Sequence, residues 1–436
     1  MNMNPQQPFL YKGGLPFLPY FLLLLSVALI IGASGNLLAL WGYNYAGLGG
    51  NPIEKIHPST FTLIAALLSL LGYRNGAQRL QAGLLQPAIF TSLCCSLLAI
   101  VYAQLVLKQP LSGLIVSWLT PVLLLALLLQ MNRSQALRLE YLLHALMLVN
   151  SIMGVIEFVQ GSALVPPVLL DYTGSGAELD VSEWGEWRAS GLFGHPLAAT
   201  LACGLVVVAV YALICFRRAS RLQIFTLLHC LAVMPLFGGR TSIFATILFV
   251  LLMSLARLWL DFSGKTDNRI DLFKVLCAVF ALLCAALWAY QAGMLDPLLE
   301  RLQDDKGSGQ TRFSALEIVA DTSWLELFFG DFKGLLPYRQ VVFGTIYGIE
   351  IFWVGMLLIY GALASVFIFI GCWRALCLCA ETYSSLAWWP ITFFFFAISS
   401  GVGLTVKSTA FSFLMIVFVF MLCSRRSGGV EESLSA

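Results

Sequence analysis

Long apolar runs recur along most of this chain, and they constrain its fold more than any other feature of the sequence. A helix that crosses a bilayer needs about 20 apolar residues. Hydrophobic residues make up 59% of the chain and charged residues 11%, whereas soluble domains carry about 25% charge. We therefore expect an all-α membrane protein, a polytopic transmembrane helix bundle that forms one domain over residues 1–436.

Twelve of the runs have the length and composition of membrane spans. The stretch 222–260 is too long for one crossing and is interrupted by Gly238-Gly239-Arg240. We predict two helices there, joined by a tight turn, with Thr241 and Ser242 placed to cap the second. The twelve predicted spans are 18–40, 59–73, 84–107, 111–131, 139–159, 196–216, 222–238, 241–260, 273–292, 349–371, 387–403 and 408–423.

The distribution of Lys and Arg between the loops predicts the orientation. Positive charge collects on the cytoplasmic side of membrane proteins, and here it collects in every second short loop. This pattern places both termini in the cytoplasm, and the long loops 160–195 and 293–348 outside, in the periplasm of a bacterial inner-membrane protein. The short loops that carry this signal hold Arg74, Arg79, Arg133, Arg138, Arg217, Arg218 and Arg221.

Charge and motifs exclude several classes of function. The chain has 25 Lys and Arg against 23 Asp and Glu, so it lacks the basic field that draws proteins to nucleic acid, and we expect no nucleic-acid partner. Neither a Walker-type nor a Rossmann glycine loop occurs, and no His, Cys, Asp or Glu cluster has metal-ligand spacing. We expect neither a metal nor a cofactor.

Three arginines in predicted outer segments run against the orientation rule. Arg188 precedes His195 and Pro196 at the start of a helix, Arg240 lies in the shortest outer turn, and Arg312 precedes a predicted interfacial amphipathic helix over 313–329. A guanidinium beside free helix N–H groups can hold a phosphate. Each also has a simpler explanation, such as a surface pair with Glu186 for Arg188 or snorkelling to the head groups for Arg240.

Other outer residues are candidates for proton transfer and for sugar binding. His195, Asp321 and Glu350 carry groups that could take a proton from a sugar hydroxyl, although Glu350 could equally be a favourable charge at a helix N-terminus. The sequence does not choose among them. Stacking on sugar rings is predicted for Trp184, Trp187 and Trp324, and packing roles for His57, His144 and His229.

Four of the segments that hold these residues, taken in their order along the chain, resemble the bacterial O-antigen polymerase (Wzy-type) and O-antigen ligase superfamily. The resemblance covers about 185–360 and rests on four segments: Arg188-Ala189-Ser190-Gly191-Leu192-Phe193-Gly194-His195-Pro196, Gly239-Arg240-Thr241-Ser242, Thr311-Arg312-Phe313, and Glu350 through Gly355. It implies a metal-independent, inverting transfer of glycan from undecaprenyl pyrophosphate to an acceptor hydroxyl in the periplasm. Carried over, it implies that Arg188, Arg240 and Arg312 bind the pyrophosphate, sometimes beside a chain-length regulator protein.

One departure from the family pattern favours a polymerase over a ligase. The ligases keep a histidine near the end of the second large loop, and residues 293–348 contain none. We therefore expect an enzyme that joins lipid-linked repeat units of a surface polysaccharide or exopolysaccharide. The alternatives are a ligase that passes glycan to lipid A-core or protein, and a flippase or transporter of a lipid-linked saccharide, which would need charges deep within the spans.

Overall fold

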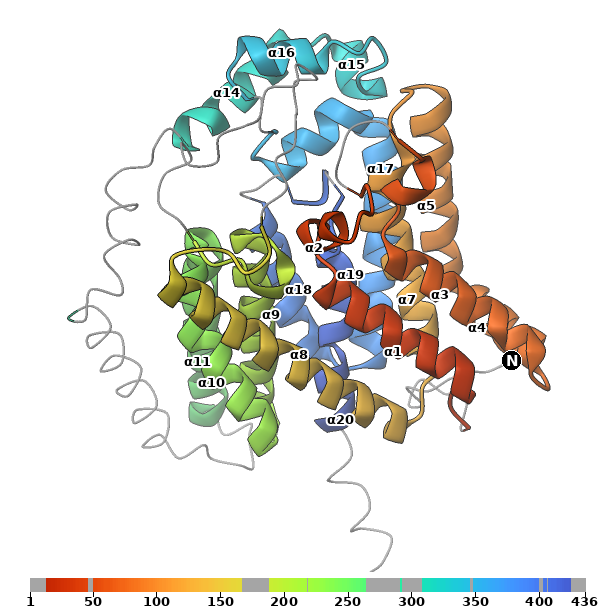
Figure 1. The fold of residues 1–436 in the computed structure, drawn as a ribbon, viewed down its shortest axis with the longest axis vertical. Coiled ribbons are helices and arrows are strands. Elements are labelled where there is room, and N and C mark those ends of the chain that lie inside the picture. Colours follow the sequence, from red (N-terminus) through yellow and green to blue (C-terminus); the bar gives the residue numbers. More distant parts are fainter. Residues whose placement is uncertain are drawn as a thin grey trace, which may run out of the picture.

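The computed structural model describes residues 13–45, 50–166, 188–217, 219–263, 291, 308–345, 348–399, 403–405 and 407–424. Within these ranges the regular structure is helical throughout. The predicted span 273–292 and the greater part of loop 160–195 lie outside the described residues. Figure 1 shows the helices packed as a bundle, with a smaller group of helices at one end.

Six helical segments of the described chain are long and apolar enough to cross a membrane. Five of them are the single helices α5 (Pro87–Leu105), α8 (Arg133–Gln160), α9 (Pro196–Phe216), α11 (Arg240–Phe262) and α17 (Phe352–Thr382). The sixth, Leu111–Leu128, consists of α6 (Leu111–Leu114), a π-helical turn (Ile115–Leu119) and α7 (Thr120–Leu128). Five shorter apolar segments accompany them: α1 (Phe17–Gly32), α3 (Pro58–Ser69) with its last turn to Gly72, α10 (Arg221–Phe237), α18 (Trp388–Ile398) with its preceding turn from Ser385, and α19 (Ala410–Val417) continuing into α20 (Val419–Ser424). An apolar helix thus stands at each predicted span that the structure describes.

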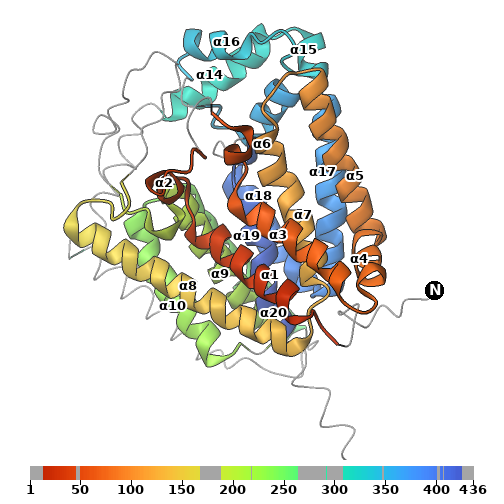
Figure 2. The ribbon, with the colours of Figure 1, turned by 45° about the vertical axis from the view of Figure 1, so that its right-hand side comes forward.

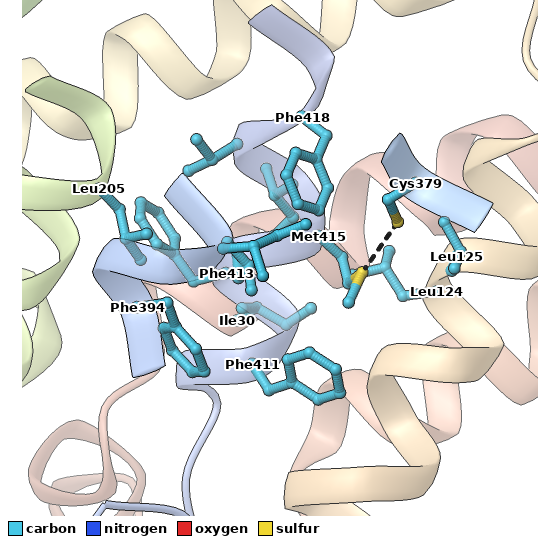
Figure 3. Packing of buried hydrophobic residues seen from close by; sticks show 14 of the residues in the cluster. Ile30, Leu124, Leu125, Leu205, Cys379, Phe394, Phe411, Phe413, Met415 and Phe418 are labelled. Carbon is cyan, nitrogen blue, oxygen red and sulfur yellow. Dashed lines mark hydrogen bonds between the residues drawn. The ribbon is translucent and has the colours of Figure 1, made fainter. Parts of the chain in front are cut away.

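The centre of the bundle is α19. Its residues from Phe411 to Val417 are almost completely buried, because helices surround it on every side. Figure 3 shows Phe411, Phe413 and Met415 among side chains of α1, α7, α9, α17 and α18, with Sγ of Cys379 3.7 Å from Sδ of Met415. A helix that is apolar all round has no polar face to present to water, so it takes the middle of the bundle.

The predicted tight turn between 222–238 and 241–260 is confirmed. Gly238 ends α10 in the left-handed conformation (φ 67°), which glycine adopts without strain. The prediction that Thr241 and Ser242 cap the next helix is wrong. Helix α11 already begins at Arg240, and among the described residues no side chain caps it. The cap position falls to Gly239, whose N–H is bound by Thr200 of α9.

Three short helices form a cap at one end of the bundle: α14 (Ser308–Asp321), α15 (Trp324–Phe329) and α16 (Leu336–Val342). Figures 1 and 2 show the cap at the end where α5 finishes and α17 begins. The single amphipathic helix predicted over 313–329 is wrong, because Ser323 and Glu326 form a reciprocal capping box that starts a new helix. Helix α14 buries Ala315 and Ile318 against the rest of the protein, whereas Phe313 and Leu316 are exposed.

A kink in α17 anchors the cap. At Gly361 the backbone leaves helical geometry (φ 75°), and the end of α15 packs so closely there that a Cβ on Gly361 would meet the backbone N of Gly330. The N–H of Asp331 donates to the carbonyl of Ile359 (3.2 Å), a carbonyl that the kink leaves accessible. Tyr102 of α5 donates to the carbonyl of Phe329 at 2.6 Å. The cap is therefore fixed to both α5 and α17.

Candidate functional site

The segment from residue 188 to residue 195, which we call the α9 loop, is held by two buried side chains of α8. One carboxylate oxygen of Glu157 accepts from the N–H groups of Ser190 (2.7 Å) and Gly191 (2.9 Å). About two turns earlier on the same face of α8, the side-chain oxygen of Asn150 accepts from the N–H of Leu192 at 3.0 Å. Both side chains are fully buried. Since buried polar groups anchor what they bind, this loop has a defined shape, and Arg188 is fixed at its start.

His195 ends the α9 loop and caps α9. Its Nδ1 accepts from the N–H of Leu197 at 3.2 Å, and Pro196 occupies the first helical position, as predicted. In the neutral ring Nε2 therefore carries the proton and is a donor. Desolvation and, secondarily, the charge of Arg188 lower the pKa of His195 to about 4, so the ring is neutral at pH 7. The residue as a whole is exposed.

Arg240 begins α11 and lies beside the first turn of α9. The hydroxyl of Thr200 accepts from the N–H of Gly239 (3.1 Å) and itself donates to the carbonyl of Pro196 (2.8 Å). A Cβ on Gly239 would lie 2.6 Å from the Thr200 hydroxyl, so the close contact between the two helix starts requires glycine. The N-termini of two long helices thus meet here, and their partial positive charges add to those of the arginines.

Arg312 and Glu350 face one another between the cap and the bundle. Nε of Arg312, on α14, lies 3.7 Å from a carboxylate oxygen of Glu350, and both side chains are about two-thirds covered. Glu350 precedes α17 by two residues. Its two predicted roles, as a base and as a favourable charge at the helix N-terminus, both stay predictions. Nearby, Nε1 of Trp353 donates to the hydroxyl of Ser399 at the end of α18. Helix α18 in turn packs against α9 and α11.

Asp321 and Trp324 belong to the cap. Asp321 is paired with Arg339 at 3.1 Å and is half exposed, and Trp324 is 72% exposed at the start of α15. Arg339 also binds the buried carboxylate of Glu326 at 3.2 Å. Burial alone would raise the pKa of Glu326, but hydrogen bonds from Ser323 and Arg339 outweigh it and lower that pKa below its usual value. This ion-pair network holds α14, α15 and α16 together.

A further cation, Lys407, lies just before α19. Its ammonium group stands 4.6 Å from the centre of the Tyr45 ring and donates to the Tyr45 carbonyl. Lys55 donates to the adjacent carbonyl of Asn44 at 2.8 Å. Desolvation, and then the charge of Lys55, lower the pKa of Lys407 to about 8. Two lysines therefore hold neighbouring carbonyls of one loop.

The structure brings Arg188, His195 and Arg240 to the first turn of α9, and pairs Arg312 with Glu350. Trp184 and Trp187 lie outside the described residues. The sequence analysis missed Asn150, Glu157 and Thr200, which hold the α9 loop and the Gly239 turn in place. For Asn150 and Glu157, the sequence does contain a signal that could have found them. These two polar residues are seven positions apart, on one face of a largely apolar helix.

Comparisons of the chain with family models, with curated proteins and with solved structures found no match. The site is therefore interpreted from its own chemistry. That chemistry comprises two arginines and a neutral histidine donor at the meeting point of two helix N-termini, with a carboxylate and a third arginine beneath the cap.

Proposed function

We propose that this protein is a polysaccharide polymerase of a bacterial inner membrane, with about twelve spans, both termini in the cytoplasm and its site in the periplasm. It transfers a glycan from undecaprenyl pyrophosphate to a sugar hydroxyl of a second lipid-linked repeat unit. The observation that carries the proposal is the convergence of Arg188, His195 and Arg240 on the first turn of α9. Pyrophosphate is the lipid-borne group that such a set of donors fits best.

Each residue has a separate task in this reaction. Arg188 and Arg240 neutralise the leaving pyrophosphate, and Nε2 of His195 donates a hydrogen bond to one of its oxygens. Stabilising charge as it develops on the leaving group is the largest contribution that such a site can make. A neutral donor suits this task, because it can be buried near the bilayer without the desolvation penalty of a charged one.

Glu350 is the base in this proposal. The acceptor hydroxyl attacks the anomeric carbon and loses its proton to the Glu350 carboxylate, while the bond from that carbon to the pyrophosphate oxygen breaks. Arg312 orients the carboxylate and supplies positive charge to the same anion. His195 is less suited as the base, because its Nδ1 is bound to the N–H of Leu197 and Nε2 carries the proton.

The test uses purified full-length protein in liposomes with a lipid-pyrophosphate-linked oligosaccharide of the source organism, and it separates the products by size. A ladder of lengthening lipid-linked chains is expected. Transfer to added lipid A-core or protein, without a ladder, would identify a ligase. Movement of unchanged substrate across the bilayer would identify a transporter. Either of the last two results would overturn the proposal.

A further inference from the structure

The interface between α8 and α10 contains a row of polar side chains inside two apolar helices, which we call the polar row. Most of its members are buried, and His229 is half-buried. Polar and ionisable groups within apolar helices are expensive to keep and commonly mark a functional path. The polar row consists of Glu140, His144 and Ser151 of α8, with Gln223, Thr226 and His229 of α10.

His144 lies between the hydroxyl of Thr226 and the carboxylate of Glu140. Nδ1 of His144 lies 2.6 Å from the hydroxyl of Thr226, and that hydroxyl is also within 3.1 Å of the Leu222 carbonyl. A carbonyl only accepts, so a hydroxyl that donates to it must accept from Nδ1. Nε2 of His144 then faces the carboxylate of Glu140 at 3.5 Å. The pair thus places a basic ring nitrogen beside a carboxylate within an apolar surrounding.

His229 of α10 binds a hydroxyl of α8, just as His144 of α8 binds a hydroxyl of α10. Its Nδ1 lies 2.8 Å from the hydroxyl of Ser151, which donates to the Met147 carbonyl at 3.0 Å. Nδ1 of His229 is therefore a donor, and Nε2 is left as an acceptor. Among the described residues, this buried Nε2 has no hydrogen-bond partner. An unsatisfied buried acceptor in a native structure calls for an explanation, and a ring nitrogen with an unused lone pair is a group that can take up a proton.

The row, extended along α8 to Glu157, has the length of a path through the bundle. Glu140 and Glu157 are 17 residues apart on α8, a rise of about 26 Å. The hydrocarbon core of a bilayer is about 30 Å thick. His144 and Ser151, the residue that binds His229, are seven residues apart on α8, and Thr226 and His229 are three residues apart on α10. At the far end Glu157 binds the α9 loop, so the row leads from the arginine-rich end of the helices to the candidate site.

The helices packed around the row bring other titratable and aromatic groups near it. Helix α10 itself contributes Cys230, which faces Cys203 of α9. Helix α1 brings Tyr20, whose hydroxyl donates to the Gln135 carbonyl near Arg138. Helix α20 brings the ring of Phe420, 5.1 Å from that of His144. Within the part of the chain that the structure describes, the nearest neighbours of the two histidines are thus apolar or uncharged, apart from Glu140.

We propose that the polar row binds and relays protons through the helical bundle. A proton that reaches the Glu140–His144 pair binds there. Transfer to Nε2 of His229 returns the pair to its former charge, and release toward the Glu157 end restores the row. The process changes no oxidation state and needs no co-reactant. It is driven by the membrane potential and by any pH difference, and it is independent of the proposed glycosyl transfer.

The test measures proton uptake into liposomes that contain the full-length protein and an enclosed pH-sensitive dye. A potassium diffusion potential, negative inside, drives protons inward. Wild-type protein should exceed protein-free liposomes clearly, and His229→Gln and His144→Gln should each reduce the uptake at least 10-fold. Glutamine keeps a donor for Ser151 or Thr226 but cannot take up a proton, so the brace between the helices is preserved.

The matched control is Ser254→Ala, which breaks the comparable Tyr211–Ser254 hydroxyl pair between α9 and α11 and should leave uptake unchanged. Uptake in the wild type equal to that of protein-free liposomes would overturn the proposal. Equal uptake in the wild type and in both glutamine variants would also overturn it and leave the row as a brace only. Should either variant fail to fold, Glu140→Gln is measured against the same control with the same two outcomes.

Discussion

The α9 loop and the cap lie toward the same end of the bundle, yet they are held in place in different ways. In the α9 loop, a buried carboxylate and a buried amide of α8 bind backbone N–H groups. In the cap, carboxylates bind the side chains of Arg339 and Lys333. The cap uses its acidic groups to neutralise its own basic groups. In the α9 loop, the carboxylate of Glu157 binds backbone N–H groups.

In our proposal, the α9 loop is a binding region and the Arg339 network of the cap is structural. A buried carboxylate that binds backbone N–H groups gives the α9 loop a fixed shape, as a site for an incoming anion requires. A closed ion-pair network gives rigidity between short helices and leaves little charge for a ligand. We therefore expect substitutions in the α9 loop and at Arg240 to affect activity, and substitutions in the Arg339 network of the cap to affect its local stability.

The largest effect is expected from Arg240→Ala. Loss of one charged donor to the leaving pyrophosphate should lower the rate of chain growth by about 10²–10³-fold, while the protein stays folded in the membrane. The rate is measured from the ladder in reconstituted liposomes. Arg221→Ala is the matched control, because Arg221 is exposed at the opposite end of the same helix pair. Normal chain length in the Arg240 variant would remove Arg240 from the site.

A large effect on stability is expected from Glu157→Gln. The carboxylate accepts three backbone N–H groups, and the amide would turn a donor toward at least one of them. Leaving a buried donor unsatisfied costs about 1–3 kcal/mol, so the α9 loop should loosen and activity should fall with it. Hydrogen exchange at residues 190–192 measures the loosening. Glu381→Gln, at an exposed position of α17, is the control. Unchanged exchange at those amides would contradict the proposed anchoring.

A moderate, local effect is expected from Glu326→Gln. Neighbouring side chains cover Glu326, but the cap is a thin layer, so we expect a loss of about 1–2 kcal/mol in cap stability. Faster hydrogen exchange in α15 and α16, with no change in α9, would show it. The pKa of Glu326 is lower in the folded protein than in the unfolded chain. Its contribution is therefore complete above the unfolded value and disappears as the pH falls through the folded one. Protection of the cap that does not change as the pH falls would argue against this pairing.

The smallest effect is expected from Asp321→Asn. The side chain is half exposed, and its ion pair with Arg339 is at the surface end of the network, so about 0.5 kcal/mol or less should be lost. Chain growth should stay within about twofold of the wild type, because a surface pair contributes little. A drop of 100-fold or more would instead favour Asp321 over Glu350 as the base.

The apolar runs predicted the helices well, because burial in lipid and burial in protein both require apolar residues. The Gly238–Gly239 turn was predictable for a local reason, since glycine there removes the steric barrier to a left-handed turn. The division of 313–329 into two helices was harder to predict. Its cause is local, the reciprocal bonds of Ser323 and Glu326, but the apolar pattern over the same residues indicated one continuous helix.

The charged residues of the candidate site could be predicted from the sequence, whereas the residues that hold them in place were harder to predict. Arg188, Arg240 and His195 stand out because each is polar next to an apolar run. Asn150 and Glu157 gain their meaning from the α9 loop, which is more than 25 residues away along the chain, and no local pattern links them. The polar row was likewise hidden, because the partners of His144 and His229 lie on α10 and α8 and meet only when these helices pack.

The central claim is that the first turn of α9 binds a lipid-borne pyrophosphate. The most direct measurement is the affinity of the purified protein for undecaprenyl pyrophosphate without glycan, in the wild type, in the Arg188→Ala/Arg240→Ala double variant, and in Arg374→Ala as an exposed control on α17. We predict that the double variant binds at least 100-fold more weakly and that the control binds as the wild type does. Equal affinity in all three proteins would contradict the claim.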